Sequence, residues 1–181
     1  MINIISAIGA LVIFGTFLSS SNRLMIGNTQ VAEQNEYYIS AVSLAQSVID
    51  EAKTKAFDQN TDTSAVSSVD LLTAPTSLGT DGAAETVPKP DTLFPGSPYT
   101  SSSRGYRSTY KFNDVDDYNK YIRLVNTQRA EGFTISVKVK YADETDPDPQ
   151  RMVRTYCKKM TVTVTSPFLS DPVTLYYAFT Y

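Results

Sequence analysis

The sequence predicts an α+β fold in which a long N-terminal α-helix packs on a C-terminal antiparallel β-sheet. No proline occurs before Pro75, and the apolar side chains of residues 31–57 recur at helical spacing. From Tyr106 onward, apolar and polar residues alternate with a period of two, which is typical of half-buried strands. The chain has 181 residues, 41% of them hydrophobic, which is enough to bury a core.

Residues 1–18 carry no charged side chain and are mostly apolar. As a helix they reach roughly 27 Å, close to the thickness of a bilayer's hydrocarbon core. A cleaved signal peptide normally has basic residues before its apolar run and a small-residue cleavage site, and neither is seen here. A buried helix of a soluble domain would rarely be apolar on every side at a chain terminus. We therefore interpret this segment as a retained membrane-spanning helix.

The helical pattern continues beyond this segment, so residues 1–57 are predicted to form one helix. Residues 1–27 are its membrane or filament-core part, and residues 28–57 are amphipathic. The apolar face of the second part consists of Val31, Tyr38, Ala41, Val42, Ala45, Val48, Ile49, Ala52 and Ala56. A run of poor helix formers interrupts the first part, and we expect the helix to loosen there after assembly. This run comprises Gly15, Ser19, Ser20, Ser21 and Asn22.

Residues 58–105 are rich in Ser, Thr, Pro and Gly and are predicted to form a long surface loop. Apolar patches at residues 69–72 and 93–94 would hold the loop on the body of the protein. A disordered linker between two domains is the alternative. The many hydroxyl side chains also make the loop a candidate carrier of O-linked glycans.

Residues 106–181 are predicted to form an antiparallel β domain. The clearest strand is residues 133–141, in which Phe133, Ile135, Val137, Val139 and Tyr141 alternate with polar residues. The further strands are expected at residues 106–113, 119–126, 152–165 and 173–181.

The composition excludes most catalytic and binding chemistry. The chain has no histidine and a single cysteine, which removes Ser-His-Asp and Cys-His nucleophilic systems and any intrachain disulfide. Glycine-rich phosphate-binding loops are absent, and the net charge of −3 is opposite to that of a nucleic-acid binder. We expect no enzymatic activity, no cofactor and no nucleic-acid partner. Cys157 is expected to be a buried structural thiol.

Asp114, Asp116 and Asp117 form the only acidic cluster of note. Their oxygens are ligands that calcium prefers, but their spacing does not match an EF-hand loop. The preferred interpretation is a polar turn in which the carboxylates accept hydrogen bonds from backbone amides, and no metal site is predicted.

Charge is divided unevenly along the chain. Residues 1–100 hold four basic and ten acidic residues, whereas residues 101–181 hold twelve basic and nine acidic residues. We hypothesise that the acidic loop of one subunit contacts basic sheet residues of its neighbours and so selects their register. The candidate basic residues are Lys138, Lys140, Arg151 and Arg154.

An apolar helix with an amphipathic continuation over residues 1–57, followed by a sheet that includes residues 133–181, resembles the type IV pilin and pseudopilin superfamily. Residues 113–119 are similar to an Asp-rich segment of some pilin-like proteins. The resemblance implies a subunit of an extracellular filament that first spans the cytoplasmic membrane once. It also implies a prepilin peptidase, an assembly machinery and a role such as cell adhesion. The expected filament-core residues are Ile4, Ile5, Ile8, Leu11, Val12, Phe14, Phe17 and Leu18.

The chain departs from the bacterial members of that superfamily at two points. Bacterial pilins usually carry glutamate at the fifth mature position, where this chain has Ile5, and they usually have a C-terminal disulfide. Archaeal members also lack the glutamate and have β-sandwich heads, so a β-sandwich is the alternative fold. A basic leader is expected either to have been removed before Met1 or to lie outside this chain. The alternative functions are a minor pseudopilin of a secretion system and a monomeric, membrane-anchored extracellular binding domain.

Overall fold

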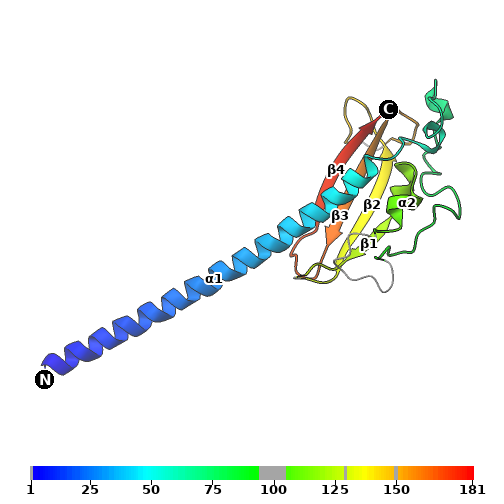
Figure 1. Cartoon of the computed structure of the whole chain (residues 1–181). Coiled ribbons are helices and arrows are strands. Elements are labelled where there is room, and N and C mark those ends of the chain that lie inside the picture. The colour runs from blue at the N-terminus through cyan, green and yellow to red at the C-terminus, as the bar shows by residue number, and fades with distance from the viewer. Residues whose placement is uncertain (1, 94–104, 129, 149–150) are drawn as a thin grey trace. The chain divides into compact units, whose positions relative to one another are not determined.

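The computed structural model describes residues 2–93, 105–128, 130–148 and 151–181, and it confirms the α+β class. Helix α1 (Ile2–Ala52) is followed by a four-stranded antiparallel sheet in the order β1-β2-β3-β4 (Figure 1). The strands are β1 (Ile122–Val125), β2 (Phe133–Tyr141), β3 (Cys157–Thr165) and β4 (Val173–Thr180). The described residues form one sheet and not the two of a β-sandwich.

The chain divides into two compact units, Met1–Tyr38 and Ile39–Tyr181. The described part of the first unit is entirely helical, and its large apolar side chains are exposed. The second unit contains the last turns of α1, the sheet and the segments that connect them. Only the second unit has a hydrophobic core.

The last turns of α1 pack on the core through one narrow apolar face. Its buried residues are Ala41, Ala45, Val48, Ile49 and Ala52, at the spacing expected of a single helical stripe. Val31 and Tyr38 were predicted on the same stripe but are 58% and 56% exposed. They belong to the first unit, where the described chain supplies no apolar surface to cover them.

Helix α1 ends at Ala52, five residues before the predicted Phe57. The chain leaves the helix because Ala56 forms a different backbone pairing. Its N–H donates to the Asn113 carbonyl oxygen (3.0 Å) and its carbonyl oxygen accepts from the Val115 N–H (3.0 Å). This short parallel bridge is incompatible with a continued helical hydrogen-bond ladder.

The core face of the sheet follows the predicted alternation. Val137 of β2 lies opposite Val162 of β3, and Val139 lies opposite Met160. All four side chains are buried, whereas the residues between them in β2 and β3 point to the opposite, more accessible face. The period-two pattern of the sequence therefore separates the core from the outer surface correctly.

The strand predicted at residues 106–113 is wrong, because this segment contains the short helix α2 (Ser108–Lys111). The carboxylate of Asp91 accepts hydrogen bonds from the N–H groups of Arg107 (3.3 Å) and Ser108 (3.1 Å) at the start of that helix. The backbone of Asp91 is itself paired with Arg123 of β1. A distant residue thus sets the local conformation, and the local pattern does not reveal it.

The remaining predicted strands begin later than expected or are shorter. Residues 152–156 do not belong to β3, and the predicted strand at residues 119–126 is reduced to β1.

The described part of the predicted loop, residues 58–93, packs against the rest of the second unit. It contains two short 3₁₀ turns, Gln59–Thr61 and Val69–Leu71, and it buries Leu72, Leu78 and Val87. Leu72 and Leu78 contribute to a small apolar cluster with Tyr141 of β2. The alternative of a disordered linker is therefore wrong for residues 58–93. Phe94, which belongs to the second predicted apolar patch, and residues 95–104 lie outside the described residues.

A buried ion pair connects the end of α1 to the sheet. Arg123 Nη2 donates to Glu51 Oε2 at 2.6 Å, and the arginine is only 3% exposed. Glu51 Oε1 also accepts hydrogen bonds from the hydroxyls of Ser108 (2.8 Å) and Tyr118 (2.9 Å). The carboxylate therefore accepts hydrogen bonds from three separate segments of the chain.

We predict that Arg123→Ala destabilises the second unit by about 3–5 kcal/mol, because it leaves the Glu51 carboxylate without its buried cation. Lys53→Ala is the matched control, because it removes the exposed pair with Asp50 (3.0 Å) and should cost less than about 1 kcal/mol. Both stability losses can be measured by urea unfolding of the full chain in detergent, with the near-UV circular dichroism of its tyrosines as the signal. Equal midpoints for the two variants would contradict the prediction.

Candidate functional site

The eight predicted assembly residues all lie on α1 with most of their surface exposed. Their exposed fractions are Ile4 65%, Ile5 69%, Ile8 58%, Leu11 72%, Val12 61%, Phe14 59%, Phe17 67% and Leu18 51%. Leaving apolar surface in water costs roughly 25 cal/mol per Å². The segment therefore requires a lipid or protein environment that the described chain does not itself provide.

Helix α1 is long and apolar enough to cross a membrane. Its most apolar stretch of 18 residues has a mean hydropathy of 1.9, and none of that stretch is buried within the protein. Within the described residues it is the one helix that meets these criteria, and it lies near the N-terminus.

The predicted loosening segment, Gly15 to Asn22, is continuous α-helix in the single chain. Apart from its chain neighbours and the nearby helix backbone, no described atom lies within 4 Å of the position that a Cβ would occupy at Gly15, so close packing does not explain the glycine there. The prediction concerns the assembled state and stays a prediction.

The Asp-rich segment folds as a turn that its own carboxylates stabilise. Asp114 Oδ1 accepts from the N–H groups of Asp116 (2.6 Å) and Asp117 (3.2 Å). Asp117 Oδ2 accepts in return from the N–H of Asn113 (3.0 Å). This geometry matches the polar-turn interpretation. Among the described residues, no three acidic or cysteine side chains converge as the ligands of a metal ion would.

The three aspartates are buried, with exposed fractions of 1%, 1% and 2% for Asp114, Asp116 and Asp117. Burial raises the pKa of each carboxyl to about 7, and the charge of Asp117 adds to this effect at Asp114. Each carboxyl also has one oxygen without a hydrogen-bond partner among the described residues. The ionised forms of these three carboxyl groups are therefore disfavoured in the folded chain.

Lys158 is the functional residue that the sequence analysis missed. Its Nζ is completely buried and donates to the Phe57 carbonyl oxygen (2.8 Å), Asp58 Oδ2 (2.7 Å) and Asp116 Oδ1 (2.5 Å). The signal was present in the alternation of β3, because Lys158 lies two residues before Met160 on the core face. A lysine at an inward-facing strand position predicts a buried acidic partner.

Asp58 is the better stabilised of the two carboxylates that contact Lys158. Burial by itself raises the pKa of Asp58, but the hydrogen bond and charge of Lys158 and the N–H groups of Thr73 and Asn60 outweigh it. The pKa is consequently below its ordinary value. The hydroxyls of Thr73 and Tyr141 donate to the same carboxylate at 3.0 Å and 3.3 Å.

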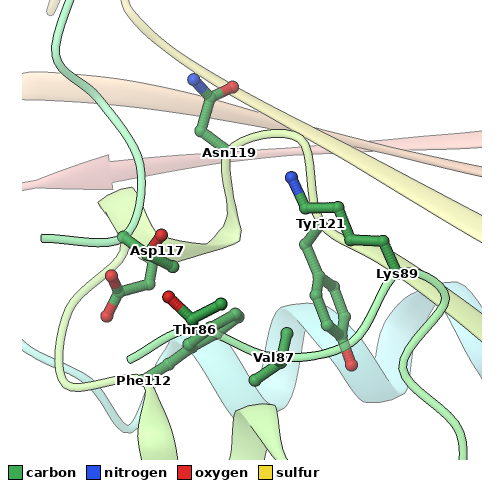
Figure 2. Close-up of a pocket in the computed structure, with 8 residues that line it drawn as sticks. Thr86, Val87, Lys89, Phe112, Asp117, Asn119 and Tyr121 are labelled. Carbon is green, nitrogen blue, oxygen red and sulfur yellow. The ribbon is translucent and has the colours of Figure 1, made fainter. Parts of the chain in front are cut away.

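A small cavity of about 110 Å³ lies between the docked loop and the Asp-rich segment. Its lining includes Thr86, Val87 and Lys89 of the loop and Asp117 and Asn119 of the Asp-rich segment, and Figure 2 shows Asp117 beside Thr86. Typical small-molecule sites enclose roughly 300–1,000 Å³. This cavity is too small for such a ligand.

The predicted basic contact residues fall into two groups. Arg151 pairs with Asp143 (2.6 Å) and Arg154 donates to the Leu72 carbonyl oxygen (2.7 Å), so both are engaged within the chain. Lys138 and Lys140 line an open groove on the outer face of β2 and make no ion pair with another described residue. Cys157 is buried and free, and burial raises the pKa of its thiol, as expected of a structural cysteine.

We predict that the unfolding free energy falls as pH rises from about 4 to about 7. In this range folded Asp114 keeps its proton, because its pKa is about 7, whereas the unfolded chain has lost it. Asp114→Asn removes this titration, so the variant's stability relative to wild type should increase with pH, by about 1 kcal/mol or more at pH 8.

Asp143→Asn is the control for that measurement. Hydrogen bonds from Thr145 and Arg151 lower the pKa of Asp143 to about 2, so above about pH 5 it is ionised in both the folded and the unfolded chain. Urea unfolding at several pH values should give wild-type pH dependence for Asp143→Asn. An unchanged pH dependence for Asp114→Asn would contradict the assignment.

Comparison of the chain with known protein families, curated proteins and solved structures found no match. The architecture itself is established: a long apolar N-terminal helix with a small antiparallel sheet, which is a pilin-like arrangement.

Proposed function

We propose that the protein is a structural subunit of an extracellular, type IV pilus-like filament. The observation that carries the proposal is the length of uncovered apolar helix in α1. Exposed large apolar residues recur closely from Ile4 to Ile26, and Val31 and Tyr38 are exposed farther along, on a part of the helix that also carries Glu33 and Glu36. From Ile4 to Tyr38 the helix measures about 51 Å at 1.5 Å per residue.

A bilayer's hydrocarbon core is only about 30 Å thick, so a membrane that covered the run from Ile4 to Ile26 would leave Val31 and Tyr38 outside it. Val31 and Tyr38 lie at the end nearer the second unit, beyond the most apolar part of α1. Contacts with neighbouring copies of the helix would cover these residues, whereas lipid would not. This favours the filament subunit over a monomeric membrane-anchored binding domain.

The exposed apolar surface of α1 also accounts for the proposed assembly of the filament. In the precursor, lipid covers the apolar helix. In the filament, the helices of other subunits replace the lipid, and a head-to-tail contact repeated along one axis produces an open helical polymer. A prepilin peptidase and an assembly machinery are the partners that the resemblance implies. A minor pseudopilin with the same architecture would use the helix in the same way but would occur at a filament tip.

The second unit supplies the outer surface of the proposed filament. Its polar groups are largely satisfied within the chain, as the Glu51–Arg123 pair illustrates. Lys138 and Lys140 remain available to acidic residues of a neighbouring subunit. Such exposed pairs contribute less than about 1 kcal/mol each, so they would select register while the helix supplies cohesion.

We predict that Val12→Asp abolishes filaments, because assembly would bury an unpaired carboxylate in an apolar bundle. Val12→Leu is the matched control and should assemble normally. Cells that express each variant are sheared, and the supernatant is imaged by electron microscopy. Abundant fibres from Val12→Asp, or fibres that lack this chain in wild-type cells, would refute the proposal.

We also predict that the helix loosens between Gly15 and Asn22 in the filament, because glycine and the Ser/Asn run favour helix least strongly there. A filament map at a resolution that shows the backbone tests this directly. Unbroken α-helical hydrogen bonding from Gly9 to Gly27 would overturn this prediction without affecting the proposed function.

A further inference from the structure

Three segments that are distant in sequence bring their side chains together around Lys158. Lys158 lies on β3, Asp58 follows the end of α1, and Asp116 belongs to the Asp-rich turn. All three residues are at most 1% exposed. The Phe57 ring centroid is 4.5 Å from Lys158 Nζ, and that of Tyr141 is 5.3 Å away. The amine is therefore held between two carboxyl groups in surroundings without solvent.

The two carboxyl groups are suited to different roles. Asp58 accepts hydrogen bonds from Thr73, Asn60 and Tyr141 in addition to Lys158, so its anionic form is strongly stabilised. Asp116 Oδ1 contacts Lys158 Nζ, while its Oδ2 has no partner among the described residues. Burial also raises the pKa of Asp116 to about 7. Asp116 is thus the group most easily held as a neutral carboxylic acid, which is the electrophilic form.

We propose that Lys158 Nζ and Asp116 Cγ become joined by an intramolecular isopeptide bond, with Asp58 as the base that deprotonates the amine. The geometry that supports this is the buried Nζ in hydrogen-bond contact with both carboxyl groups, at 2.5 Å from Asp116 and 2.7 Å from Asp58. The proposal does not depend on the proposed function, because it concerns the second unit alone.

The reaction is a condensation that balances without an oxidant, a reductant or a second substrate. Asp58 takes one proton from the Lys158 ammonium, and the nitrogen lone pair attacks Cγ of protonated Asp116. The tetrahedral intermediate collapses when the Asp116 hydroxyl leaves with a second proton from nitrogen, as one molecule of water. The products are an amide and water, and Asp58 returns its proton to solvent.

Two physical effects favour this condensation in the folded chain. Fixing amine and acid in contact replaces a bimolecular encounter by an intramolecular one, which is worth several orders of magnitude in rate. Burial of Asp116 away from water disfavours its carboxylate form, so the interior favours the neutral acid that the amine attacks. The product would replace a buried ion pair, which is costly to desolvate, by a neutral amide.

Mass spectrometry of the full chain purified in detergent tests the proposal. The wild-type chain should be lighter than its sequence requires by one water molecule. Lys158→Arg keeps the positive charge but lacks the reactive amine, so this chain should have its full mass. Lys159→Arg is the matched control on the same strand, because Lys159 pairs with Asp148 (2.7 Å), whose side chain is 90% exposed. This variant should still lack one water.

A peptide digest provides the second measurement, and its result for the wild-type protein does not depend on any variant folding. It should contain a branched peptide that joins the segments around Asp116 and Lys158, and this peptide should be lost in Asp58→Asn. The sequence Asp81–Gly82 can also lose water by forming a succinimide, which hydroxylamine cleaves and an amide resists. A wild-type chain of full mass would overturn the proposal. So would a mass deficit of one water that hydroxylamine removes, or one that persists in Lys158→Arg.

Discussion

The fold of Ile39–Tyr181 depends on one buried polar side chain, that of Lys158, whose Nζ lies between two carboxyl groups. It donates to the backbone of Phe57, to Asp58 and to Asp116, and so connects the chain after α1, the Asp-rich turn and the sheet. A lysine without such partners would not be tolerated on the core face of a strand. The position of Asp58, which also organises Thr73 and Tyr141, follows from this requirement. Arg123 and Glu51 repeat the same arrangement at β1.

The two units of the chain differ in how their apolar side chains are covered. In the second unit, the buried basic side chains of Arg123 and Lys158 contact carboxyl groups, and the apolar side chains of the sheet are covered by α1 and the docked loop. In the first unit, the apolar side chains are uncovered along the whole helix. The protein therefore combines a domain that buries its own apolar side chains with a helical segment whose apolar side chains only other molecules can cover.

Periodicity allowed the main elements to be predicted, because it reports which face of an element is buried. It located β2 correctly and separated its core residues from Lys138 and Lys140. It failed where a distant residue determines the local conformation. Asp91 holds the first turn of α2, and Ala56 ends α1 by pairing with the Asp-rich segment. The site around Lys158 was missed for the same reason, since its members are 42 and 100 residues apart.

The order of the strands also determines how the chain acquires its structure. Each strand of β1-β2-β3-β4 pairs with its neighbour in sequence, so every pairing closes a short segment. Local pairings are entropically cheap and form rapidly. The contact of Asp58 with Lys158 closes a far longer segment and should form late. We therefore expect the hairpins to fold first, and the last turns of α1 to dock on a sheet that already exists.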